Sequence, residues 1–409
     1  MKQLSLTTAG LLALMTTVSH AQSAREDSFE QIERGRYLSV LGDCSACHTA
    51  PGTAPFSGGV VLKTPFGNLV GPNITPDAET GIGRMTEDEF QKVMSDGIGR
   101  GGYHLYGAMP FTAFTKVSKA DNSAIYAYLQ SLQPVENAIE PNQLPFPFSV
   151  RTSLIVWNYL NFQKGEFKAD PAKSQEWNRG AYIVEGLGHC GTCHTPKTAL
   201  GGDKNDQFLE GATLQDWHAP NITADLHKGI GSWSKDDLVA YLKTGTNRFD
   251  TASGPMAEEV EHSSQHWTGE DLKAVATYLK DGPDVDGKAP TPIPASDNRM
   301  TAGREIYADR CSACHMPNGE GVSRLFPKLS TAPLVNANDP ASLVRVVLAG
   351  SKADGTQAAP TGPAMPSFAW NLSDENVADV LTFVRNSWGN AAPAVKGSDV
   401  EALRTRLQE

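Results

Sequence analysis

The sequence contains 409 residues, of which 40% are hydrophobic, 38 are Gly and 26 are Pro, a composition that suits two to four compact, loop-rich domains. Asp and Glu outnumber Lys and Arg by 46 to 35, so the formal net charge is −11 at pH 7. This acidic balance argues against nucleic acid as a partner.

The N-terminus has the pattern of a secretory signal peptide. Lys2 precedes an apolar run from Leu4 to Val18, and Ser19-His20-Ala21 forms a small-x-small cleavage site. The run is shorter than the roughly 20 residues of a membrane span, and no later stretch approaches one. We therefore predict that residues 1–21 are removed on export to the periplasm. Attachment to the outer face of the inner membrane would then be peripheral or through partners.

The first predicted domain covers residues 30–132. A helical stretch around Gly35 leads into the motif Cys44-Ser45-Ala46-Cys47-His48, which is followed by Pro72-Asn73-Ile74-Thr75 and Gly81-Ile82-Gly83. A closing helix begins at Ser118-Lys119-Ala120-Asp121, a pattern typical of a capping box.

Residues 133–176 are predicted to be a Pro-rich linker that contains an apolar helix, Leu154 to Phe162. This stretch is too short to span a bilayer. We expect a helix buried between domains, and the alternative is a patch that faces a membrane or a partner.

The second predicted domain, residues 177–281, repeats the order of the first. Gly180-Ala181-Tyr182 leads into Cys190-Gly191-Thr192-Cys193-His194, and Pro220-Asn221-Ile222-Thr223 and Gly229-Ile230-Gly231 follow. The first Cys and the Asn lie 29 residues apart in one copy and 31 in the other. Such similarity between units of this length indicates a duplicated domain.

A second linker, residues 282–297, precedes a third predicted domain at residues 298–390. This domain keeps an opening helix, the motif Cys311-Ser312-Ala313-Cys314-His315 and a last helix from Ser373, but it lacks the Pro-Asn-Ile-Thr segment. The tail, residues 391–409, is expected to form a short surface helix capped near Ser398.

Cys-x-x-Cys-His is the attachment pattern of c-type haem, in which two thiols form thioethers with the porphyrin and the imidazole binds the iron. A thioredoxin-like pair would leave the His unexplained, structural zinc would need about four ligands per site, and the three motifs leave no cysteine for disulfides. The sequence thus predicts three covalent haem c groups. Their predicted residues are Cys44, Cys47, Cys190, Cys193, Cys311 and Cys314 for attachment, and His48, His194 and His315 as iron ligands.

The sixth iron ligand is predicted to be a methionine sulfur. Met256 is the only methionine between His194 and the next linker, Met109 lies at the matching distance in the first domain, and Met365 has the same Ala-Met-Pro setting as Met109. Met85 and Met94 are expected to be packing residues. The alternative is ligation by a second histidine, for which the candidates are His104, His189, His218, His262 and His266.

The predicted fold is therefore all-α, with three consecutive cytochrome c domains of which the first two are an evident duplication. The chain resembles the triple-haem cytochrome c subunit of membrane-associated periplasmic dehydrogenases that oxidise alcohols, gluconate or fructose. The likeness rests on the three motifs, on the two Asn-Ile-Thr segments with their Gly-Ile-Gly, and on two further stretches, Leu144-Pro145-Phe146-Pro147-Phe148-Ser149 and Gly254-Pro255-Met256-Ala257-Glu258.

The resemblance implies an electron-transfer subunit with no substrate site of its own. A separate catalytic subunit, a flavoprotein, quinoprotein or molybdenum enzyme, would oxidise the substrate, and the haems would pass the electrons to ubiquinone or an oxidase. Several relatives end in a hydrophobic anchor, whereas Glu401 to Glu409 is polar, which favours other acceptors as well. The alternatives are a free-standing periplasmic electron shuttle and a haem enzyme such as a peroxidase, which would need an open sixth site.

Overall fold

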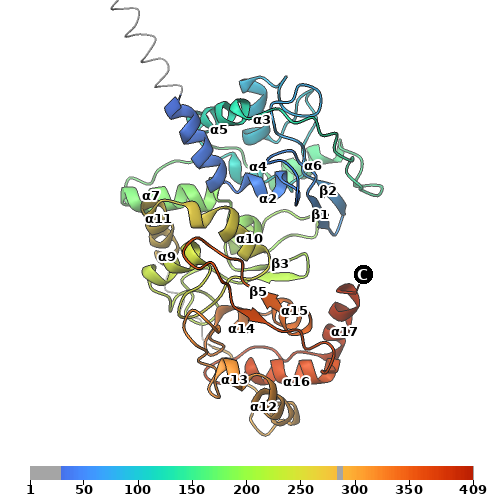
Figure 1. The fold of residues 1–409 in the computed structure, drawn as a ribbon, viewed down its shortest axis with the longest axis vertical. Helices are drawn as coiled ribbons and strands as arrows, with labels where there is room; N and C mark the ends of the chain where they lie inside the picture. Colours follow the sequence, from blue (N-terminus) through green and yellow to red (C-terminus); the bar gives the residue numbers. More distant parts are fainter. Residues whose placement is uncertain (1–28, 283–288, 409) are drawn as a thin grey trace, which may run out of the picture.

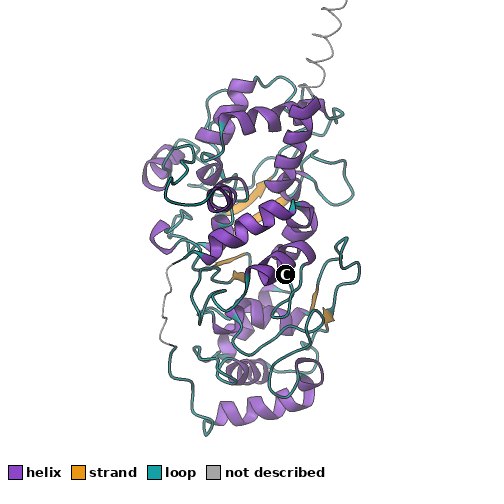
Figure 2. Ribbon diagram, turned by 90° about the vertical axis from the view of Figure 1, so that its left-hand side faces the viewer, coloured by secondary structure: helices purple, strands orange, loops and turns teal. Residues whose placement is uncertain are grey.

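The computed structural model describes residues 29–282 and 289–408, so the predicted signal peptide and part of the second linker lie outside the described residues. The chain is rich in helices, as predicted. Three sections follow one another along the long axis of the molecule (Figures 1 and 2). We call them the N-terminal section (29–132), the middle section (175–281) and the C-terminal section (298–408). Within the described ranges, no helix is both long and apolar enough to cross a bilayer.

The N-terminal section opens with a helix over residues 29–41. Its hairpin, β1 and β2, is antiparallel and pairs Val61 with Val70. The remaining elements of this section, and the helix of the connection that follows, are α2 (Cys44–His48), β1 (Val61–Thr64), β2 (Gly67–Val70), α3 (Glu87–Asp96), α4 (Phe111–Phe114), α5 (Lys119–Ser131) and α6 (Ser153–Asn161).

The middle section has the same order of α-helices and strands, with three additions: its opening helix ends in a π-helical turn, η1, and it contains two 3-10 helices, η2 and η3. It consists of α7 (Gln175–Tyr182), η1 (Ile183–Leu187), α8 (Gly191–His194), η2 (Asn205–Gln207), β3 (Ala212–Leu214), β4 (Trp217–Ala219), α9 (Lys235–Thr244), α10 (Pro255–His262), η3 (Ser264–His266) and α11 (Gly269–Lys280).

The C-terminal section consists of α12 (Asn298–Arg310), α13 (Ser312–His315), α14 (Pro333–Asn336), α15 (Ala341–Ala349), β5 (Ser351–Lys352), β6 (Ala364–Met365), α16 (Asp374–Val384) and α17 (Gly397–Arg406). The pairs β3–β4 and β5–β6 are antiparallel, like β1–β2. All these strands have two to four residues, too few for an alternating pattern to predict them.

In each section the opening helix crosses the closing helix at a glycine. A Cβ atom built on that glycine would overlap a backbone carbonyl oxygen of the closing helix, so the two backbones can approach only because the side chain is absent. The glycine and carbonyl pairs are Gly35 with Ala124, Gly180 with Ala274, and Gly303 with Asp379.

The closing helix of the N-terminal section begins at the predicted residue. Ser118 is the N-cap of α5, and its side chain accepts a hydrogen bond from the backbone N–H of Asp121. The Asp121 carboxylate does not complete the predicted capping box, because it binds Arg34 and Tyr182 instead. The local pattern predicted that the Asp121 side chain completes the cap, but it binds two residues that are distant in the sequence.

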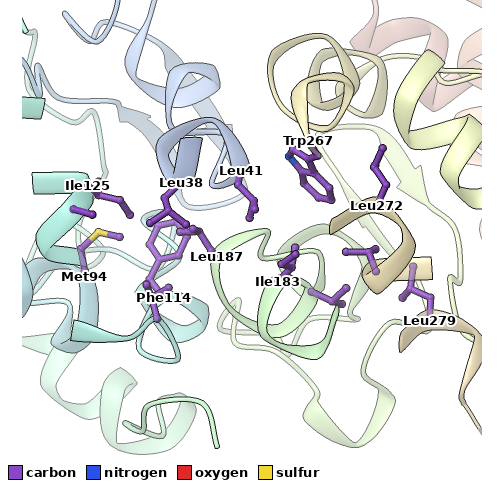
Figure 3. Packing of buried hydrophobic residues seen from close by; sticks show 14 of the residues in the cluster. Leu38, Leu41, Met94, Phe114, Ile125, Ile183, Leu187, Trp267, Leu272 and Leu279 are labelled. Atoms are coloured by element: carbon purple, nitrogen blue, oxygen red, sulfur yellow. The ribbon is translucent and has the colours of Figure 1, made fainter. Parts of the chain in front are cut away.

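The N-terminal and middle sections share one hydrophobic core. Leu38, Leu41 and Phe114 from the first section pack with Ile183 and Leu187 from the second (Figure 3). The C-terminal section has a separate core. A helix does form in the predicted tail, but its N-cap is Lys396 rather than Ser398, and Val400 and Leu403 are buried in this core. The helix α17 is therefore a packed element.

The prediction that the apolar stretch of the connection is buried between domains is wrong. It does form the helix α6, but of its large apolar residues only Leu154 is fully buried. The side chains of Ile155, Val156, Tyr159 and Leu160 are 55%, 61%, 87% and 62% exposed. Trp157 of α6 and Phe162 pack against Phe111, and the exposed side chains of α6 are compatible with the alternative, a patch that faces a membrane or a partner.

We expect the substitution Gly180→Ala to lower the free energy of unfolding by about 3 kcal/mol, because its methyl group would push α7 away from α11. Thermal unfolding of the purified holoprotein, followed by circular dichroism, measures this loss. Gly269→Ala is the matched control, since a Cβ at the first residue of α11 meets no atom within 4 Å. Equal stability of the two variants would contradict the assigned crossing.

Candidate haem-attachment sites

Each Cys-x-x-Cys-His motif forms a short helical turn just after the opening helix of its section. The histidine is the last residue of α2, α8 and α13, so each motif ends its helical turn at the imidazole. None of the six cysteines forms a disulfide. Burial raises the pKa of Cys44 and of Cys190 to about 12, and that of Cys311 to about 11. These thiols are therefore neutral at pH 7.

The three motif histidines are held by the same kind of hydrogen bond. Nδ1 lies 2.7 Å from the carbonyl oxygen of Pro72 for His48, 2.7 Å from that of Pro220 for His194, and 3.0 Å from that of Pro327 for His315. A proline carbonyl can only accept, so Nδ1–H donates and Nε2 carries the lone pair. This tautomer presents Nε2 as a metal ligand.

Burial also keeps these imidazoles neutral. It lowers the pKa of His48 and His315 below the ordinary value, and it lowers the pKa of His194 to about 4. Each hydrogen bond to a proline carbonyl opposes this shift but does not outweigh it. Neutral imidazole with a free Nε2, next to two unoxidised thiols, is the donor set that covalent haem c requires, so the residues present fit this group.

The proline carbonyls were not predicted as partners of the histidines, although the repeated Pro-Asn-Ile-Thr segment contains their signal. In the middle section, Oδ1 of Asn221 accepts hydrogen bonds from the backbone N–H and the hydroxyl of Thr223, at 2.8 and 2.7 Å. Asn73 and Thr75 form the same turn in the N-terminal section. The turn fixes the backbone immediately after the proline that binds the histidine.

The three methionines predicted as axial ligands are all half-buried. Met109 lies just before α4, Met256 is the second residue of α10, and Met365 ends β6. Met94 is 3% exposed and belongs to the shared core, and Met85 packs against that core, as expected of packing residues. Met109, Met256 and Met365 are also packed against hydrophobic clusters, so burial does not distinguish them from Met85. Their role as iron ligands stays a prediction.

Four of the alternative histidines have hydrogen-bond partners within the chain. His104 bonds to the Asn158 side chain, His189 to the Leu187 carbonyl, His218 to the Thr213 hydroxyl and His266 to the Glu261 carbonyl. His262 lies in the last turn of α10.

The first attachment turn packs against the middle section. The helix α10 packs against α2, and a Cβ on Gly42, just before α2, would lie 3.1 Å from Cδ1 of Leu187, at the end of η1. The chain leading into α2 therefore meets the chain leading into α8 at the junction between the two sections.

Comparison with known proteins agrees with this geometry. Residues 32–133 and 300–388 match the cytochrome c family model. The chain is 39% identical to the gluconate 2-dehydrogenase cytochrome c subunit of Pantoea cypripedii, over 96% of this chain and 94% of that protein. It is 39% identical to the cytochrome c subunit of the quinone alcohol dehydrogenase of Gluconobacter oxydans, over 97% and 86% of the two chains.

A third relative, the fructose dehydrogenase cytochrome subunit of Gluconobacter japonicus, is 35% identical over 91% of this chain and 82% of its own length. The chain belongs to this family of dehydrogenase cytochrome c subunits. These relatives are cytochrome subunits of dehydrogenases and not their catalytic subunits. Membership supports an electron-transfer role and indicates haem c as the cofactor.

We expect Asn221→Ala to lower the free energy of unfolding by about 1 kcal/mol, because the N–H and hydroxyl of Thr223 lose their acceptor. Urea denaturation of the holoprotein measures the change. Asn221→Asp keeps Oδ1 as an acceptor and should retain most of the stability. If the Asp variant loses as much as the Ala variant, the turn does not depend on this oxygen.

Proposed function

We propose that the chain binds three haem c groups and relays electrons from the catalytic subunit of a dehydrogenase to a quinone or another respiratory acceptor. The observation that carries the proposal is the threefold recurrence of a neutral imidazole whose Nδ1–H is held by a proline carbonyl beside two free thiols. The proposed domains are residues 30–132, 177–281 and 298–390, each a cytochrome c domain, the first two arising by duplication.

In this proposal each haem has one pair of cysteines, one histidine and one methionine. Bound haem c supplies a one-electron couple at its iron. The protein residues orient the imidazole, exclude water and supply the thioether that favours the reduced state. The proposed sets are Cys44, Cys47, His48 and Met109; Cys190, Cys193, His194 and Met256; and Cys311, Cys314, His315 and Met365.

The arrangement of the sections supports a relay with the middle haem between the other two. The backbone N–H of Lys328 donates to the Phe249 carbonyl at 2.8 Å, and the N–H of His218 donates to the Ser342 hydroxyl at 2.7 Å. These bonds join the C-terminal section to the middle section, which also shares its core with the N-terminal section. An electron that crosses the whole chain would therefore pass the middle motif.

The partner is proposed to be a flavoprotein, quinoprotein or molybdenum dehydrogenase, because the relatives are named as subunits of gluconate, alcohol and fructose dehydrogenases. Haem c is attached outside the cytoplasm, so the proposed location is the periplasm. We propose that the chain binds the outer face of the inner membrane through its partners.

A pyridine haemochrome assay of the purified wild-type protein should give three haems per chain. Cys190→Ala/Cys193→Ala should give two, and it should also destabilise the N-terminal section, because the two sections share one core. The matched control, Cys311→Ala/Cys314→Ala, should give two haems but leave unfolding of the first two sections unchanged, because its core is separate. A wild-type value below three haems would contradict the proposal.

Affinity purification of the tagged chain from native membranes should also recover a large dehydrogenase subunit, and the substrate of that enzyme should reduce the haems in the isolated complex. The alpha-band absorbance of reduced haem c measures the reduction. A chain that purifies alone, and whose haems are reduced equally fast in extracts with and without dehydrogenase substrates, would support the electron shuttle instead.

A further inference from the structure

The junction between the N-terminal and middle sections contains two hydrogen-bonded sets that mirror each other. The hydroxyl of Tyr37, on the opening helix of the first section, donates to the Asp271 carboxylate of the second at 2.6 Å. The hydroxyl of Tyr182, on α7 of the second section, donates to the Asp121 carboxylate of the first, also at 2.6 Å. Each section thus binds the closing helix of the other.

Each tyrosine makes a second bond to the same helix. The Tyr37 oxygen accepts from the backbone N–H of Thr268 at 3.2 Å, and the Tyr182 oxygen accepts from that of Ser118 at 3.1 Å. Thr268 and Ser118 are the N-caps of α11 and α5. Each tyrosine hydroxyl therefore binds both the N-cap residue and a carboxylate of the closing helix in the other section.

Both carboxylates also have an arginine partner within their own section. Nε of Arg34 lies 2.9 Å from Asp121, and Nε of Arg179 lies 2.7 Å from Asp271. The two aspartates are only 3% and 7% exposed. Removing a tyrosine hydroxyl would therefore break its hydrogen bond to the aspartate of the other section, while the arginine would still pair the buried carboxylate.

Both tyrosines keep their hydroxyl proton around neutral pH. Burial and the bond to Asp121 raise the pKa of Tyr182 well above its ordinary value, and burial raises the pKa of Tyr37. Burial alone would raise the pKa of Asp271, but Arg179 and Tyr37 together hold it below its ordinary value. Each tyrosine hydroxyl therefore remains a hydrogen-bond donor.

The C-terminal section lacks this arrangement among the described residues. Tyr307, on its opening helix α12, donates its hydroxyl to the carbonyl of Met316 in the same section, at 2.6 Å. Tyr307 thus stabilises the turn after the motif of its own section, whereas Tyr37 and Tyr182 each donate a hydrogen bond to the other section. The junction between those two sections is the one at which the chain leading into α2 meets the chain leading into α8, at Gly42 and Leu187.

We infer that Tyr37 and Tyr182 are positioning residues that hold the first and second haem sites in one fixed mutual orientation. This inference rests on the proposed function. Electron tunnelling slows steeply as the separation of two redox centres grows, so a reciprocal pair of hydrogen bonds across the junction would keep the first transfer step fast. Either bond alone restrains the separation, and both together also restrain rotation.

The test is the Soret circular dichroism of the oxidised holoprotein, in which two close haems in a fixed orientation give a bisignate exciton couplet. We expect a couplet in the wild type, a weaker one in Tyr37→Phe and in Tyr182→Phe, and loss of most of its amplitude in the double variant. Haem content and the near-infrared band of thioether-bound iron should stay unchanged, which separates orientation from ligation.

Tyr126→Phe is the matched control, because its hydroxyl donates to the Met85 carbonyl at 2.6 Å within one section, and its couplet should equal that of the wild type. If the double variant does not bind all its haems, the couplet amplitudes of Tyr182→Phe and Tyr126→Phe are compared instead. Equal amplitudes in these two variants would contradict the inference. A couplet in Tyr37→Phe/Tyr182→Phe equal to the wild type would overturn the inference. So would a wild type with three haems and no couplet, whereas fewer than three haems would overturn the proposed function.

Discussion

The close approach of two helix backbones at a single glycine is the constraint on which the rest of the structure depends. Gly35, Gly180 and Gly303 allow the opening helix to touch a carbonyl of the closing helix, where any side chain would overlap it. The crossing sets the direction in which the opening helix ends, and the Cys-x-x-Cys-His turn follows within ten residues or fewer. An attachment site is thereby built on two rigid helices and not on a free loop.

The second requirement is a histidine that stays neutral and correctly oriented before any metal is bound. Burial lowers the pKa of all three motif imidazoles, and a proline carbonyl receives the one N–H that each neutral ring retains. Proline suits this role because it has no N–H of its own to compete in the turn. The C-terminal section reaches the same result with Pro327, without the Asn-Ile-Thr turn that supports the other two.

Local patterns in the sequence were sufficient for features that depend on neighbouring residues. They include the opening helix of each section, the cap at Ser118, the helix α6 and the similar order of elements in the first two sections. What they could not predict depends on residues far apart in the chain. The Asp121 carboxylate binds Tyr182, 61 positions away, and not the helix cap. On α6, Trp157 packs against the distant Phe111, whereas Tyr159 is exposed. The strands were too short to show a period.

The two junctions between sections differ in kind, and this difference bears on how electrons could move. The first junction combines a shared hydrophobic core with buried, charge-assisted hydrogen bonds. Separation of these two sections would expose the core and break those bonds, at a large cost in free energy. The second junction joins two separate cores through hydrogen bonds such as that of His218 with the buried Ser342 and that of Lys328 with Phe249, and through the more exposed pair of Arg406 with Asp216. The first junction therefore rests on apolar burial as well as on polar contacts, whereas hydrogen bonds and ion pairs join the C-terminal core to the middle section. In a relay built this way, the two transfer steps would cross junctions of different kinds.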